Sequence, residues 1–192
     1  MDGRAFRLLG LCFAATVCAA TPSAAEQAEP GTQKEAFLEA LDGTRIKVAD
    51  IVFKDIDDGA GQTYEIRWNK EPFSDHFLSM RPFRCIAGPD KHWCHVPYPY
   101  EIERQVHPDE LTDLEYDFLF VWKGATDYGI DMWNGVYYDL ETNGERLVGR
   151  LHDVNMDVLA VPPEHGDLRP IAAKDLEPGE PESHWLPTLI IE

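Results

Sequence analysis

Apolar and polar residues alternate along much of the chain, and this alternation predicts a protein built mainly from β-strands. The segment 44–53 (TRIKVADIVF) begins with the alternation, and the segment 64–68 (YEIRW) repeats it after a connection rich in Asp and Gly. A period of two places every second side chain on the same face of a strand. We therefore expect these two segments to pair as an antiparallel hairpin.

Turn residues between β-rich runs indicate two further hairpins. The runs 83–86 and 93–96 flank Ala-Gly-Pro-Asp, which is strong turn chemistry. The runs 136–140 and 146–151 flank Asn143-Gly144, the preferred pair for a two-residue type I′ turn. Gly149 lies inside the second run and predicts a bulge or a close backbone approach.

Four other segments complete the predicted strands. The run 116–122 (YDFLFVW) is apolar on both faces, as a central strand is. The segments 101–106 and 155–161 are weaker candidates, and 189–191 (LII) predicts a last strand.

Two short helices are also expected. The segment 33–41 follows Thr32, which stands three residues before Glu35 in the spacing of a capping box, and it is rich in helix-forming Ala, Leu and Glu. A second helix is predicted near Pro108, with Leu111 and Leu114 on its buried side.

The predicted fold is therefore all-β, a small antiparallel barrel or sandwich with one or two short helices, and α+β is the alternative. The segment WNGVYYDLETNGERLVGRL, residues 133–151, resembles a hairpin of a small calycin-type barrel. That resemblance implies a barrel form of the all-β fold.

The N-terminus has the pattern of a secretory signal peptide, residues 1–25. Arg4 and Arg7 precede an apolar run of thirteen residues, 8–20, and small residues precede Glu26. We expect residues 26–192 to form a single β-rich domain, with an irregular Pro- and Gly-rich segment at about 162–183. The expected location is periplasmic or secreted, and we expect no membrane span.

The charge of the chain narrows the choice of partners. The sequence carries a formal net charge of −18, which disfavours nucleic acid and favours cationic ligands, cationic partners or divalent ions. The simpler interpretation is that the charge keeps an exported protein soluble.

Two cysteines, Cys85 and Cys94, follow the predicted leader. In an oxidising compartment this pair predicts a disulfide across the second hairpin. The alternative is that both thiolates bind a metal together with His92 and His95.

A metal site is a separate candidate, with His76, His92 and His95 as ligands for zinc or copper. The spacing argues against it, because residues three apart on a strand face opposite sides. We expect no cofactor. Ser74-Asp75-His76 contains the residue types of a catalytic triad, but sequence neighbours are not expected to point at one another as a triad requires.

Aromatic residues suggest a binding surface in the segments 72–101 and 128–138. Tyr and Trp provide rigid contact area for sugars, cationic groups or protein partners. The alternative is that most of these rings belong to the core. The candidates are Trp93, Tyr98, Tyr100, Tyr128, Trp133 and Tyr137. We expect a non-catalytic binding or interaction module for an unknown protein or small molecule; the alternative is an exported enzyme, metal-dependent through its histidines or hydrolytic through a carboxylate pair.

Overall fold

The computed structural model describes residues 31–56, 59, 61–77, 82–163, 166 and 168–192. The predicted leader, residues 1–25, lies outside this part of the chain. The predicted all-β fold is confirmed, because the described residues form mostly antiparallel sheet. The strands are β1 (Thr32–Glu39), β2 (Arg45–Asp55), β3 (Gln62–Trp68), β4 (Ser74–Phe77), β5 (Pro82–Ala87), β6 (Lys91–His95), β7 (Gln105–Val106), β8 (Phe120–Gly124), β9 (Gly135–Asn143), β10 (Arg146–Val154), β11 (Leu176–Pro178) and β12 (Thr188–Ile191).

The helical elements are short. One α-helix, α1 (Thr112–Asp117), precedes β8. Four 3₁₀ turns complete the described structure: η1 (Met132–Asn134), η2 (Met156–Leu159), η3 (Ala173–Asp175) and η4 (Pro181–Ser183).

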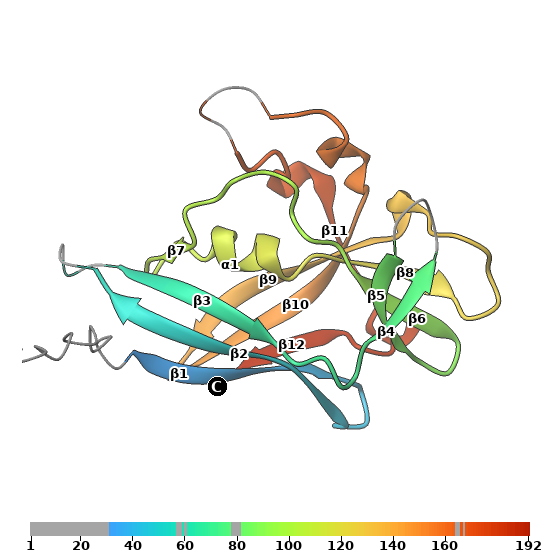
Figure 1. Ribbon diagram of the computed structural model, residues 1–192, viewed down its shortest axis with the longest axis horizontal. Helices are drawn as coiled ribbons and strands as arrows, with labels where there is room; N and C mark the ends of the chain where they lie inside the picture. The colour runs from blue at the N-terminus through green and yellow to red at the C-terminus, as the bar shows by residue number, and fades with distance from the viewer. Residues whose placement is uncertain (1–30, 57–58, 60, 78–81, 164–165, 167) are drawn as a thin grey trace, which may run out of the picture.

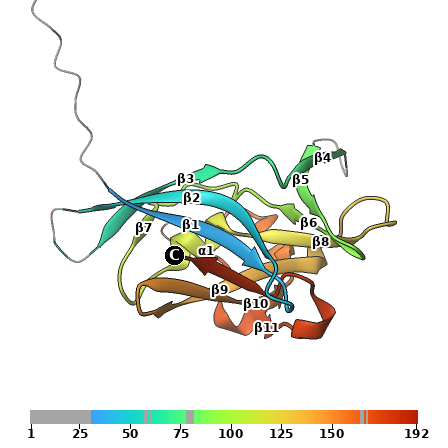
Figure 2. The same cartoon turned by 90° about the horizontal axis from the view of Figure 1, so that it is seen from below.

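All strands belong to one sheet that does not close. Its order is β4-β5-β6-β8-β9-β10-β12-β1-β2-β3-β7, and β11 also pairs with β10. The sheet coils so that the β1–β2–β3 side faces the β8–β9–β10 side, with α1 between β3 and the β9–β10 pair (Figure 1). The turned view shows the same two sides of the sheet from below (Figure 2). The fold is therefore consistent with a sandwich whose edges, β4 and β7, remain apart.

The main core fills the space between these two sides. Inward-facing residues of opposite sides meet there, such as Leu38 and Ile51 from one side and Phe120 and Tyr138 from the other, all fully buried or nearly so. This shared core explains why the two sides of the sheet pack face to face, because each strand has an apolar face to remove from water.

A second apolar cluster lies on the outer face of β5, β6, β8 and β9. It includes Cys85, Cys94 and Val121, and it is covered by residues of the segment 154–171. Strand β8 is therefore buried on both faces, as the apolar run around it predicts, although this strand begins at Phe120 and not at Tyr116.

Helix α1 is held in place by its carboxylates. The Asp113 side chain is fully buried and accepts a hydrogen bond from Arg169 Nε at 2.7 Å. Asp117 accepts bonds from Arg104 and from the Tyr64 hydroxyl at 2.9 Å. The predicted second helix is thus present, but it starts at Thr112, because the residues after His107 form a tight turn instead.

Two predicted elements are wrong. The segment 33–41 is not a helix but strand β1, which pairs with β2 on one edge and with β12 on the other. Tertiary pairing overrides the helix propensity of this segment, and its buried residues Ala36 and Leu38 follow the period of a strand. The segment 155–161 is not a strand, because Asn155 caps the 3₁₀ turn η2 by accepting a hydrogen bond from the Asp157 amide.

The three predicted hairpins are confirmed, with one change in a turn. Asn143 pairs with Arg146, so Gly144 and Glu145 are the central turn residues. Gly144 has φ +65° as the first of the two, the arrangement of a type II′ turn. At Gly149 the register is continuous, and a Cβ atom would lie 2.9 Å from Cβ of Tyr138, so a close approach explains this glycine.

Candidate ligand-binding site

A cavity of about 720 Å³ lies at one open end of the sheet. The β9–β10 hairpin forms one wall, and the ends of β2, β3 and β7 form the other, at the left of Figure 1. The connection from β7 to α1 completes the cavity between these walls.

The floor of the cavity is apolar. It contains Phe53 from β2, Val106 from β7, Leu111 before α1 and Leu147 from β10. Each side chain packs one side on the main core, and the cavity exposes the other side. Such a floor favours a hydrocarbon group, at about 0.8 kcal/mol for each methylene removed from water.

The rim of the cavity is polar, and its side chains are held by hydrogen bonds. Gln62 Nε2 donates to Asp55 at 2.7 Å, and the Lys34 ammonium donates to the Glu145 carbonyl. The His107 ring lies directly over Gly61, where a Cβ atom would be 2.5 Å from Cε1 of the ring. Glycine at position 61 therefore allows this wall of the cavity to form.

An acidic hollow of about 440 Å³ continues from the cavity. The two share four lining residues, Asp109 and Leu111 among them. The hollow is lined by five carboxylates, and none of its described lining residues is Lys, Arg or His. The five are Asp109, Glu110, Glu115, Asp139 and Glu141.

Glu115 is the most buried of these carboxylates, at 6% exposure. Its two oxygens accept hydrogen bonds from the Tyr137 hydroxyl and from the Leu140 amide, the latter at 2.7 Å. Burial raises the pKa of Glu115 and the nearby Asp139 adds to this, while the two hydrogen bonds oppose it. At Glu110 the hydrogen bond from Thr112 lowers the pKa, so this carboxylate stays ionised.

Together the cavity and hollow present an apolar surface beside concentrated negative charge. A ligand with a hydrocarbon part and a cationic part would satisfy both at once. The net charge of the chain, −18, would also attract such a ligand from a distance.

The six predicted aromatic residues do not form one surface. Trp93 is fully buried and its Nε1 donates to the Tyr138 hydroxyl at 3.1 Å. Tyr137 is 5% exposed and bonds to Glu115. Both therefore belong to the interior, Trp93 in the main core and Tyr137 in the second apolar cluster.

The tyrosines of the Pro-Tyr-Pro-Tyr segment are half-buried. Tyr98 packs edge-on against Tyr116, with ring centroids 4.7 Å apart, and its hydroxyl donates to the Leu168 carbonyl. The Tyr100 hydroxyl donates to the Leu159 carbonyl at 3.2 Å. Tyr98 therefore connects to the irregular segment at Leu168, and Tyr100 connects to the 3₁₀ turn η2 at Leu159. Of the six, Tyr128 and Trp133 are exposed, at 102% and 67%.

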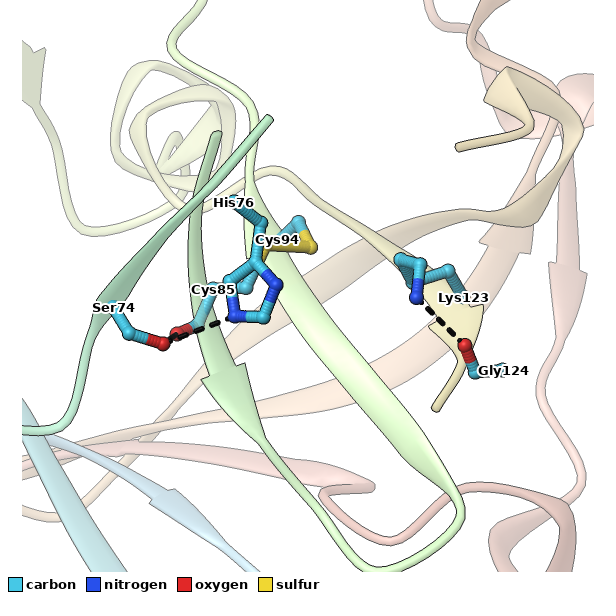
Figure 3. The surroundings of a disulfide bond; sticks show 6 residues. All are labelled: Ser74, His76, Cys85, Cys94, Lys123 and Gly124. Atoms are coloured by element: carbon cyan, nitrogen blue, oxygen red, sulfur yellow. Dashed lines mark hydrogen bonds between the residues drawn. A yellow bond between two sulfur atoms is a disulfide. The ribbon is translucent and has the colours of Figure 1, made fainter. Parts of the chain in front are cut away.

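The predicted hairpin disulfide lies in the second apolar cluster. Cys85 and Cys94 pair across β5 and β6, and their Sγ atoms are 2.09 Å apart. Figure 3 shows the His76 ring beside this bond, with Lys123 across from it. Ser74 Oγ lies 3.0 Å from His76 Nε2, so these two side chains do meet, against the expectation from their closeness in sequence.

The three candidate histidine ligands are divided between two faces. His76 and His92 lie together, with ring centroids 5.1 Å apart, whereas His95 packs against Trp68 on the inner side. This division follows from the three-residue spacing of His92 and His95. Burial lowers the pKa of His92, and the charge of Lys123 lowers it further. Within the described ranges no three His, Cys, Asp or Glu side chains are grouped to hold a metal ion.

The cavity residues were not identified from sequence as a site. Its apolar residues gave only the signal of core positions, its polar residues gave that of solvent-exposed positions, and their meeting depends on pairings between distant strands. Among the helices that the structure describes, none has the length and apolar character to cross a membrane. Comparisons with protein-family models, curated proteins and solved structures found no match.

Proposed function

We propose that this protein is a non-catalytic binding module for a small amphiphilic molecule with a cationic group. The observation that carries the proposal is the continuity of an apolar cavity with a hollow lined by five carboxylates. The hydrocarbon part of the ligand would lie over Phe53, Val106 and Leu147, and the cationic group would face Asp139 and Glu141.

A matched series of ligands tests this proposal. n-Octylammonium, n-octanol and n-octanoate share one hydrocarbon chain and differ in charge, and isothermal titration calorimetry at pH 7 would compare their affinities. We expect octylammonium to bind at least tenfold more tightly than octanoate, because the hollow repels a carboxylate. Equal affinity for octylammonium and octanoate would refute the role of the acidic hollow.

Two variants test separately how the cavity and the acidic hollow contribute to ligand affinity. Leu147→Asn should weaken all three ligands, and Val161→Asn is its control because Val161 is 70% exposed and lines neither the cavity nor the acidic hollow. Asp139→Asn combined with Glu141→Gln should weaken octylammonium alone and leave octanol unchanged. If Leu147→Asn binds like the wild-type protein, the ligand lies elsewhere.

The proposal includes export through the N-terminal leader into the periplasm or the medium. The pattern of residues 1–25 supports this, as does a pair of cysteines at bonding distance, since disulfides persist in oxidising compartments. Mass spectrometry of the native protein should find its N-terminus at or near Glu26. A native protein that retains the leader would overturn the location.

A further inference from the structure

A second, separate recognition site is indicated around Trp133. This residue lies in η1, in the connection between β8 and β9, and 67% of it is exposed. Exposure of a single ring does not by itself mark a site, so the surroundings of the indole decide whether it does. Trp133 precedes the first residue of β9, whereas the cavity is lined by Thr142 and Leu147 near the β9–β10 turn, so the two sites lie at opposite ends of this hairpin. Trp133 lines neither the cavity nor the acidic hollow.

The exposed indole is held in one orientation. Its Nε1 donates to Asp157 Oδ2 at 2.6 Å, and its backbone amide donates to Asp131 Oδ1 at 3.0 Å. The ring is therefore fixed by one edge and by its backbone, and its faces remain available. A ring fixed in advance loses little conformational entropy when a ligand stacks on it.

The indole is also one wall of a hollow of about 420 Å³. Three carboxylates line the same hollow: Asp153 at the end of β10, Asp175 in η3 and Glu177 in β11. Lys174 is the basic residue among the described lining residues; it pairs with Asp175 at 2.7 Å and keeps 80% of its side chain exposed. Asp153 lies 3.1 Å from His184 Nε2. The hollow therefore combines an aromatic face with three carboxylates and one lysine.

We propose that the Trp133 hollow binds a quaternary or N-methylated ammonium group. An indole is the aromatic side chain that attracts a cation most strongly, and methylated ammonium groups add apolar contact with the ring. The carboxylates supply the complementary charge without a requirement for hydrogen-bond donors on the ligand. Such a group could come from a small molecule such as choline or from a methylated lysine of a protein partner, since both present the same chemistry.

The test uses the full mature protein and compares choline with its neutral carbon isostere, 3,3-dimethylbutan-1-ol. Titrations would follow the indole Nε1–H resonance of Trp133 by ¹⁵N-correlated NMR, assigned with the Trp133→Leu variant. We expect choline to bind at least tenfold more tightly than the isostere. A trimethyl-lysine peptide forms a second arm, and the tighter of the two ligands identifies the source of the cation.

Variants test whether choline binds at the Trp133 hollow or nonspecifically elsewhere on the protein surface. Trp133→Leu keeps an apolar side chain and should lower choline affinity about tenfold, because the π face is lost. Glu177→Gln should lower it several-fold. Tyr128→Ala is the control, since Tyr128 is fully exposed in the same connection but does not line the hollow. Leu147→Asn should leave choline affinity unchanged. The choline proposal and the proposal of ligand binding in the cavity can therefore be refuted independently of each other.

Three results would overturn the inference. Equal affinity for choline and its isostere would show an apolar contact without charge recognition. Unchanged choline affinity in Trp133→Leu would place the cation elsewhere. A methyl glycoside that shifts the Trp133 resonance at lower concentration than choline would make the site one for sugars.

Discussion

The pH dependence of stability should depend on His95, the last residue of β6. Its ring packs against Trp68 and Phe120, with centroids 4.2 and 5.5 Å away. Its Nε2 lies 3.0 Å from the Asp117 carbonyl oxygen, and because a carbonyl only accepts, Nε2 carries the proton. Burial lowers the pKa of His95 to about 4, although the Asp117 carbonyl opposes this shift.

The direction of the change in stability with pH depends on which state, folded or unfolded, binds the proton at the higher pH. Below about pH 6.5 the unfolded chain protonates this histidine, whereas the folded protein does not until about pH 4. The free energy of unfolding should therefore fall as the pH falls through this window. From pH 7.5 to pH 5.0, a pKa of about 4 in the folded protein against 6.5 in the unfolded chain corresponds to a loss of about 2 kcal/mol. Because the ring keeps some contact with solvent, we expect about 1.5 kcal/mol.

Urea unfolding at the two pH values measures this loss. The variant His95→Gln keeps a hydrogen-bond donor for Asp117 but does not titrate, so it should lose about 1.5 kcal/mol less than the wild-type protein over the same range. Carboxylates contribute equally to both proteins and cancel in the difference. His152→Gln, on the surface of β10, is the control and should follow the wild-type protein. If His95→Gln and the wild-type protein lose the same stability, the ring is as accessible to protons as in the unfolded chain.

Three further substitutions test the packing. Tyr138→Phe should lower the free energy of unfolding by about 2 kcal/mol in urea titrations, because it leaves a buried indole N–H and a buried carbonyl without their hydroxyl partner; a loss below ~0.5 kcal/mol would mean that other groups replace it. Gly149→Ala should cost about 1–3 kcal/mol, since its Cβ atom would lie 2.9 Å from Cβ of Tyr138; an unchanged melting temperature would show that the strands separate freely. Cys85→Ser should cost about 2–4 kcal/mol and make Cys94 reactive toward thiol reagents; two reactive thiols in the wild-type protein would contradict the disulfide.

Local patterns predicted the hairpins because the information for each is contained in neighbouring residues. Alternation and a turn sequence are enough to pair β2 with β3, β5 with β6, and β9 with β10. Strand β1 was missed for the converse reason. Its partner on one edge, β12, is about 150 residues away in sequence, and the Asp42-Gly43 turn that leads to β2 was outweighed by the run of helix-forming residues before it.

Local sequence also could not predict that Trp93 is buried and Trp133 is exposed. Both have polar neighbours in sequence, and both were candidates for a binding surface. Trp93 is buried because β6 lies between β5 and β8 and turns this side chain toward the main core. Trp133 stays exposed because it lies in η1, before β9 begins. The difference depends on strand order, which neither residue type nor spacing determines.

The acidic hollow depends on the packing of α1 against β9. In the sequence TDLEYD, Glu115 has the pattern of a solvent-exposed helix residue, and Asp139 and Glu141 have the pattern of the outer face of a strand. The structure brings these residues together because the Leu140 amide and the Tyr137 hydroxyl of β9 both donate to Glu115. A buried carboxylate thus fixes the helix to the strand, and the same contact gathers the negative charge beside the apolar cavity. Because Glu115 alone makes this contact, Asp139 and Glu141 are free to serve recognition, and replacing both should weaken octylammonium binding. Unchanged octylammonium affinity in that variant would show that the negative charge of the hollow only accompanies the packing of α1.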